Sequence, residues 1–101
     1  MFFFKSKRSR EVETFAVELA REIGERCKPE AAYETDRISM ALAHAIDDAC
    51  RRAAEFQREK RLGMYHRAAL GTAFKFELKD LGYDKQLVDG LTRQLLLKIS
   101  A

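Results

Sequence analysis

Three residues have the types and spacing that could perform chemistry: His44, Asp47 and Asp48. Residues three and four apart share one face of a helix, so an imidazole and two carboxylates would lie together there. Such a group could supply half of a metal site, or a histidine held by a carboxylate. Metal sites in helical bundles draw paired motifs from several helices, and His66 is the only other histidine in the chain. We therefore expect a solvated polar face here, with no metal or cofactor.

No pattern for nucleophilic catalysis is present in the sequence. It contains no G-x-S-x-G motif, and its two cysteines, Cys27 and Cys50, form no CxxC or CxxH spacing. A zinc site or a disulfide framework is therefore not indicated, and we expect two buried free thiols in a reducing cytoplasm. An enzyme would have to be assembled from scattered residues, which the sequence leaves open without favouring it.

Length and composition indicate one small globular domain. The chain has 101 residues, of which 47% are hydrophobic and 35% charged, as is typical of a folded rather than a disordered protein. No apolar run approaches the ~20 residues of a transmembrane helix. The bases near the start follow a short apolar run instead of preceding it, so no signal peptide is predicted. We expect a cytoplasmic protein.

Apolar spacing predicts two long helices in the first part of the chain. The first begins after a cap at Ser9 and ends near Cys27, just before the single proline. The second begins at Thr35 or Asp36 and runs to about Arg61. Its broad, alanine-rich face predicts contact with two neighbouring helices. The inward positions expected in this second helix are Ile38, Ala41, Leu42, Ala45, Ile46, Ala49, Ala53 and Phe56.

The dipeptide Leu-Gly occurs three times between residues 62 and 83, and its glycines have two expected roles. Gly63 and Gly82 end the second and third helices as left-handed caps. Gly71 lies inside the third helix or at its start, where the close approach of another backbone would explain it. Residues 73–78 alternate between apolar and polar types, which leaves a strand as the alternative to a helix.

A fourth helix is predicted from Asp84 to about Ser100. The fold class is therefore all-α, a compact four-helix-bundle-like single domain over residues 11–101, preceded by a basic and aromatic N-terminal arm at residues 1–10. The inward residues of the fourth helix are Leu87, Val88, Leu91, Leu95 and Ile99, and its outward residues are Lys85, Gln86, Asp89, Thr92 and Arg93.

Basic residues gather in two parts of the sequence. Residues 1–10 hold four bases and no acid, and residues 51–67 hold six bases and two acids. Bases beside aromatic residues can neutralise phosphates and stack on nucleobases, or hold a chain against an acidic bilayer. Residues 74–93 also have a loose helix-turn-helix spacing, although Asp89 in the outward face argues against phosphate contact. A small nucleic-acid-binding protein is thus the alternative function, with candidate residues Lys5, Lys7, Arg8, Arg10, Arg51, Arg58 and Arg61.

Apolar residues outside the predicted core faces favour a protein interface. At 100° per residue, Phe76 points away from the Phe74 side of its helix, and Leu97 points away from the Leu91 side. Together with Leu96 and three N-terminal phenylalanines, they exceed what a small monomer readily leaves exposed. We expect a non-enzymatic interaction or regulatory module that forms a homodimer. The candidate partner-binding residues are Phe76, Leu96, Leu97, Phe2, Phe3 and Phe4.

Overall fold

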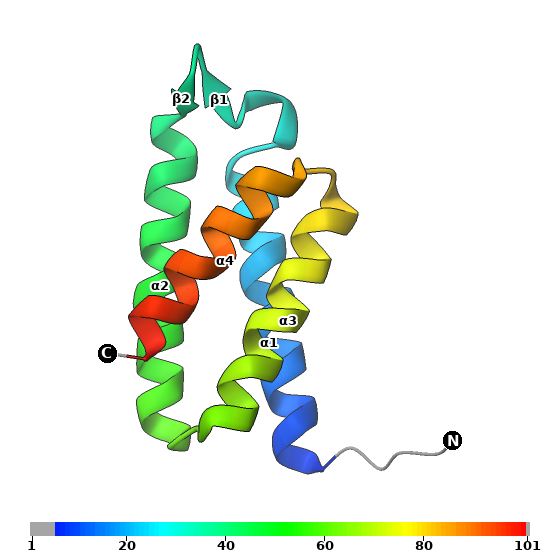
Figure 1. Ribbon diagram of the computed structural model, residues 1–101, viewed down its shortest axis with the longest axis vertical. Helices are drawn as coiled ribbons and strands as arrows, with labels where there is room; N and C mark the ends of the chain where they lie inside the picture. The colour runs from blue at the N-terminus through cyan, green and yellow to red at the C-terminus, as the bar shows by residue number, and fades with distance from the viewer. Residues whose placement is uncertain (1–5, 101) are drawn as a thin grey trace.

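The computed structural model describes residues 6–100, which form a bundle of four α-helices (Figure 1). The predicted all-α class is therefore confirmed. A 3₁₀ turn, η1 (Pro29–Ala31), and a hairpin of two short strands, β1 (Tyr33–Glu34) and β2 (Arg37–Ile38), connect the first two helices. The helices are α1 (Lys7–Arg26), α2 (Met40–Lys60), α3 (Met64–Leu81) and α4 (Lys85–Ile99).

Each helix packs mainly against two others. Helix α1 contacts α3 and α2, and α4 contacts the same two helices from the other side. Figure 1 shows α4 running obliquely between α2 and α3. The alanine-rich face of α2 thus meets two neighbours, as its width predicted. This arrangement leaves every helix with one side turned outward, and the outward sides differ in chemistry.

The start of α1 lies earlier than the sequence predicts. Ser6, not Ser9, is the N-cap, and its side-chain oxygen accepts a hydrogen bond from the Ser9 backbone N–H at 3.0 Å. Both serines are suitable caps by type, but Ser9 is buried inside the helix. The correction matters because it places Lys7, Arg8 and Arg10 on the first turn of α1 instead of on a preceding arm.

The predicted start of α2 is also wrong, because residues 33–38 form the hairpin. Tyr33 pairs with Ile38 across an antiparallel register, and Thr35 adopts a left-handed conformation with φ of 57° at the turn. Ser39 then caps α2 by accepting a hydrogen bond from the Leu42 N–H at 3.2 Å. Ala41, expected to point inward, is exposed as a result of its place in the first turn.

The two glycines expected as left-handed caps behave differently. Gly82 has a φ of 108° and ends α3 as predicted. Gly63 has a φ of −81° and a ψ of −178°, so it is the extended N-cap of α3, and the prediction is wrong there. Arg61 adopts the left-handed conformation that ends α2, with a φ of 53°. Because Arg61 makes the turn, the chain is already extended when it reaches Gly63.

The core lies between the inward faces of all four described helices. Residues 73–78 belong to a continuous α3, so the strand alternative is excluded. Gly71 is buried, and a Cβ built on it would lie 2.8 Å from Cδ2 of Leu96, so the close neighbour is a leucine side chain and not a backbone. All five inward residues predicted for α4 are buried, and Thr92, predicted to point outward, is buried as well.

Tyr83 fastens the turn between α3 and α4 to the end of α1. Its ring is buried, and its hydroxyl donates a hydrogen bond to the carbonyl oxygen of Cys27. Burial, with a smaller contribution from nearby negative charge at Cys27 and Glu30, raises the pKa of Tyr83 to about 12. The neutral phenol is therefore part of the folded structure.

A candidate protein-docking face on helix α3

The outward side of α3 carries a stripe of uncharged residues. Helical spacing of three and four residues puts them on one side, opposite the buried Phe74. The two ends of the stripe are aromatic: Tyr65 is 73% exposed and Phe76 is 56% exposed. Small residues separate them. We call this set the α3 stripe, and it consists of Tyr65, Ala68, Ala69, Thr72, Ala73 and Phe76.

The α3 stripe forms a shallow hollow on the surface. Its six residues line a depression of about 420 Å³, with Glu13 of α1 on the rim. The four small side chains form the floor because they leave space between the rings of Tyr65 and Phe76. Ala69 and Ala73 also pack against the core from the inner side. An apolar side chain from another molecule would find an apolar floor here, with a ring at either end.

Charged residues border the stripe and are held in pairs. On the α1 side, Arg21 Nε donates to Glu77 Oε2 at 2.9 Å. On the α4 side, Lys75 Nζ lies 3.6 Å from Asp89 Oδ1. Hydrogen bonding from Lys85 keeps the pKa of Asp89 below its ordinary value, so that carboxylate stays ionised. An uncharged centre with a polar rim is the usual anatomy of a protein interface.

The structure separates the residues predicted to bind a partner. Phe76 belongs to the α3 stripe, whereas Leu97 is 67% exposed on α4 and lines a different hollow with Arg93. Leu96 is half-buried, because its side chain lies over Gly71. Phe2, Phe3 and Phe4 lie outside the described residues. Tyr65 was not among the predicted partner-binding residues, although it lies on the outward side of α3 close to the start of that helix.

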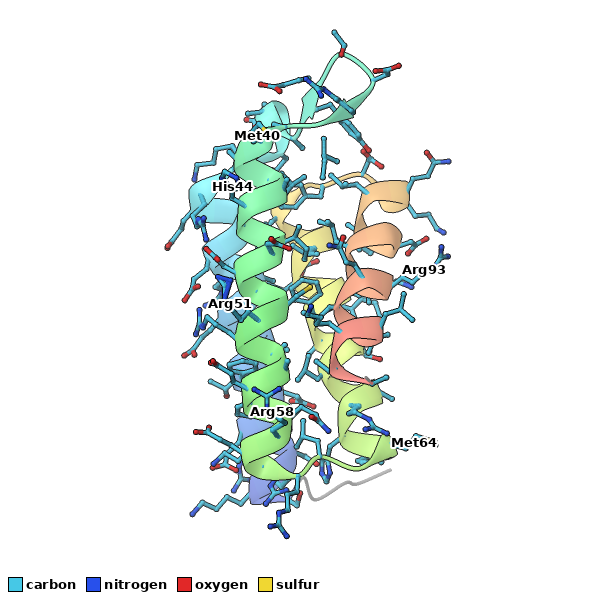
Figure 2. The ribbon with its side chains drawn as sticks, turned by 90° about the vertical axis from the view of Figure 1, so that its left-hand side faces the viewer. Met40, His44, Arg51, Arg58, Met64 and Arg93 are labelled. Carbon is cyan, nitrogen blue, oxygen red and sulfur yellow. The ribbon has the colours of Figure 1, made fainter. Side chains whose placement is uncertain are left out.

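The structure brings two basic segments together that are distant in sequence. Arg8 Nη1 donates to the backbone oxygen of Lys60 at 2.7 Å, which joins the start of α1 to the end of α2. Figure 2 shows Arg58 at this end of α2, level with Met64. Glu11 lies among these bases, with Oε2 3.7 Å from Nζ of Lys60. The bases gathered at this end are Lys7, Arg8, Arg10, Arg58, Lys60 and Arg61.

Another nucleic-acid candidate, Arg51, does not join that group. Arg51 lies near the middle of α2, away from the basic end, as Figure 2 shows, and forms an ion pair with Asp48. Lys5 lies outside the described residues. Between α1 and α2, the rings of Phe15 and Phe56 stack with centroids 4.0 Å apart, and both line a hollow bordered by Lys7 and Lys60. The basic end therefore combines aromatic and cationic groups, but acidic residues are mixed with them.

His44, Asp47 and Asp48, the residues with the spacing of a possible metal site, lie on the polar outer side of α2. His44 and Asp47 are exposed, and Asp48 Oδ2 accepts a hydrogen bond from Arg26 at 2.6 Å. That bond, together with the one from Arg51, holds the pKa of Asp48 below its ordinary value. In the part of the chain that the structure describes, no three His, Cys, Asp or Glu side chains gather as metal ligands would.

Both cysteines are buried and unbridged. Burial, and then the negative charge of Asp47, raises the pKa of the Cys50 thiol, which makes it a poor nucleophile at neutral pH. Among residues 6–100, no helix combines the length and the apolar character needed to cross a membrane.

The fold and the surface define an all-α helical bundle with an uncharged stripe, aromatic at both ends, exposed on α3. Compared with protein-family models, with curated proteins and with solved structures, the chain gives no significant match to any of them. We therefore infer the function from the geometry of the described residues.

Proposed function

We propose that this protein is a small non-enzymatic interaction module that docks another protein chain on the α3 stripe. The observation that supports this most is the exposure of two aromatic rings, Tyr65 and Phe76, at the ends of an uncharged helical face. Single exposed apolar residues are normal on soluble proteins, but contiguous apolar patches rimmed by polar residues mark interaction sites. The unbridged Cys27 and Cys50 favour a reducing compartment, the cytoplasm, for this interaction.

The magnitude of the expected effect is moderate. An aromatic side chain buries 150–250 Å² when fully covered, so covering the exposed parts of Tyr65 and Phe76 removes roughly 250 Å² from water. At ~25 cal/mol per Å², this is about 6 kcal/mol of gross stabilisation. Association costs roughly 4–15 kcal/mol in lost freedom, so the small residues between the rings must also be in contact. The complex should be weak and reversible.

A photo-crosslinking experiment tests this function. A photoreactive phenylalanine analogue is placed at position 76, and a matched control carries it at exposed Gln86 on α4. In cells of the source organism we expect an adduct from position 76 and none from position 86. Adding Tyr65→Glu should remove the adduct, because it puts a charge on the same face. If position 76 gives no adduct, or gives one that Tyr65→Glu does not change, the docking function is wrong.

A second candidate function is nucleic-acid binding at the basic end, which the Arg8–Lys60 contact favours. Each phosphate contact releases counterions, so affinity would fall steeply with salt. Replacing Lys5, Lys7, Arg8 and Arg10 with Gln should then flatten the salt dependence, while Arg51→Gln, outside the cluster, should not. Absence of binding to any DNA or RNA at ~50 mM salt, where screening is weak, would remove this candidate.

A further inference from the structure

We propose that the chain docked on the α3 stripe is a second copy of this protein, with its own α3 packed antiparallel across a twofold axis between Ala69 and Thr72. This inference depends on the proposed docking function and adds the identity and the orientation of the partner. Two properties of the stripe support it, the order of its side-chain sizes and the charges at its ends, and the area of the stripe sets how strong the dimer can be.

The order of side-chain sizes is the same read from either end of the stripe. Tyr65 lies as far before the midpoint as Phe76 lies after it, Ala68 matches Ala73, and Ala69 matches Thr72. A twofold interface uses the same patch on both subunits, so the patch must complement itself. In the antiparallel arrangement each aromatic ring faces the partner's other aromatic ring, and each small residue faces a small residue.

The small residues at the centre set how closely the helices approach. Side chains of this size allow two helix axes to lie at the short end of the usual ~8–10 Å range. Tyr65 then meets the partner's Phe76 at one end, and Phe76 meets the partner's Tyr65 at the other. Aromatic rings prefer offset or edge-to-face contacts at ~4.5–7 Å between centroids, which side chains at facing positions of two packed helices can form. The hollow between the rings is covered by the partner's own small residues.

Charge favours the antiparallel over the parallel orientation. The positive end of the α3 dipole then lies beside the partner's negative end, whereas parallel helices place like ends together. Arg61 lies four residues before the stripe, at the left-handed end of α2 and outside α3, and Asp80 follows the stripe by about one turn of α3; both are exposed, and neither takes part in an ion pair within residues 6–100. Antiparallel packing brings Arg61 to the same end as the partner's Asp80. Parallel packing would bring each of them beside its own copy.

The area of the stripe limits the strength of the dimer. From Tyr65 to Phe76 the helix rises ~16 Å, and the two copies together cover roughly 500 Å² of aromatic surface. Stable interfaces bury ~800 Å² per partner, so this contact belongs to the weak class. We expect a dissociation constant on the order of 10 μM to 1 mM, which is tight enough to measure and loose enough to be reversible.

The test uses two charged variants of the full chain, Tyr65→Lys and Phe76→Glu. Each alone should be monomeric by sedimentation equilibrium, because each homodimer would bury unpaired charges against aromatic rings. Mixed in equal amounts, they should form a heterodimer again. In the antiparallel orientation the new lysine faces the new glutamate at one end, and the native aromatic pair remains at the other. Parallel packing gives no such pairing, so it predicts no recovery.

Thermal melts and two further variants separate folding from docking. Both substituted positions are exposed, so each variant should melt within a few degrees of wild type. Phe76→Ala, which adds no charge, should weaken dimerisation at least tenfold. Leu97→Glu changes an exposed apolar residue outside the stripe and should leave the dimer intact. Dimerisation lost in Leu97→Glu but kept in Phe76→Ala would overturn the proposal.

The possible failures are distinguishable from each other. A wild-type dimer without recovery in the mixture overturns the antiparallel orientation. A wild-type chain that stays monomeric at ~1 mM, the weak limit expected here, overturns the second-copy proposal. In that case an adduct with an unlike protein at position 76 keeps the docking function, and the absence of any adduct removes both.

Discussion

The inner and outer faces of α3 both carry a phenylalanine, but the two side chains lie in different environments. Phe74 and Phe76 are the same residue type two positions apart, yet Phe74 is completely buried and Phe76 is mostly exposed. Phe74 lies in the core cluster between Leu70 and Leu78, whereas Phe76 ends the outward stripe. Their environments differ because the helix turns ~200° between them, which moves the side chain from neighbouring helices to the surface.

The outer face of α2 gives the contrast that makes α3 unusual. Its outward residues include His44, Asp47 and Arg51, which suit a face in contact with water. A helix on the surface of a bundle normally has one apolar side and one polar side. The α3 stripe departs from that rule, and the bundle itself gains little from exposed Tyr65 and Phe76. A second protein chain that covers them would account for the difference.

The largest predicted effect separates the two phenylalanines. Phe74→Ala should lower the free energy of unfolding by about 3–5 kcal/mol, because it leaves a cavity in the core. Phe76→Ala should change it by less than about 0.5 kcal/mol, as for an ordinary surface substitution. Denaturant titrations at low protein concentration, where a dimer dissociates, measure both values. Equal losses for the two variants would show that Phe76 belongs to the core.

The next prediction concerns Tyr83, which fixes the C-terminal end of α3 on the inner side. Its folded pKa of about 12 lies above the ordinary 10.0, so its contribution to stability is complete below pH 10 and is lost as the pH rises through about 12. This shift corresponds to roughly 3 kcal/mol. Tyr83→Phe should lack this alkaline loss, although the lost hydrogen bond makes it about 1 kcal/mol less stable at neutral pH.

Unfolding titrations from pH 8 to pH 12 of wild type, Tyr83→Phe and Tyr65→Phe check this prediction. Tyr65→Phe is the control, because Tyr65 is an exposed tyrosine on the α3 stripe. The roughly 1 kcal/mol advantage of wild type over Tyr83→Phe should shrink above pH 10 and reverse before pH 12, because wild type then loses more than this amount, while Tyr65→Phe follows wild type. A constant gap over this range would contradict the buried neutral phenol.

A smaller effect tests how tightly α4 covers the inner side of α3. Gly71→Ala should destabilise the fold by about 1 kcal/mol, because the new Cβ displaces the side chain of Leu96. Gly90→Ala is the matched control: it is also a mid-helix glycine, but nothing lies within 4 Å of its Cβ position. It should stabilise the fold by about 1 kcal/mol. In a Leu96→Ala background, Gly71→Ala should become stabilising as well; if it does not, Leu96 is not the obstacle.

The smallest effect belongs to the polar outer surface. Asp48→Asn should weaken stability slightly above pH 3.8, the ordinary pKa, because the carboxylate is held ionised by Arg26 and Arg51. Since the folded pKa is depressed, the contribution declines as the pH falls below 3.8 and is fully lost only below the folded pKa, so the difference between the two proteins should be smaller at pH 3 than at pH 7. Thermal melts at pH 7 and pH 3 measure the difference. A difference of the same size at both pH values would contradict this account of the Asp48 carboxylate.

Part of this structure could be predicted from the sequence because its apolar spacing is regular. The five inward residues of α4 follow a spacing of three and four without interruption, and all of them are buried. Helix starts were harder to predict. Ser6 and Ser9 are equally suitable caps by type, and the hairpin after Tyr33 depends on a left-handed Thr35 that no local preference indicates.

The candidate site was also predictable only in part, because apolar spacing identifies outward residues within a helix but does not locate the start of that helix. Phe76 falls outside the core face of α3, and the structure confirms that it is exposed. Tyr65 was not predicted, because the sequence left open whether the third helix begins before Gly71 or at it, so the alignment of Tyr65 with Phe76 was not established. The contact between Arg8 and Lys60 joins residues 52 positions apart, and only the packing of α1 against α2 reveals it.

The most direct test of the two faces of α3 is the concentration dependence of backbone amide chemical shifts. We predict that between ~20 μM and ~1 mM, a range that spans the expected dissociation constant, amides along the α3 stripe shift together. The largest changes should occur near Tyr65, Thr72 and Phe76, while amides near Leu97 and along the outer side of α2 stay constant. Shifts that are absent from the stripe, or that gather instead at the basic end around Arg8, would contradict the account.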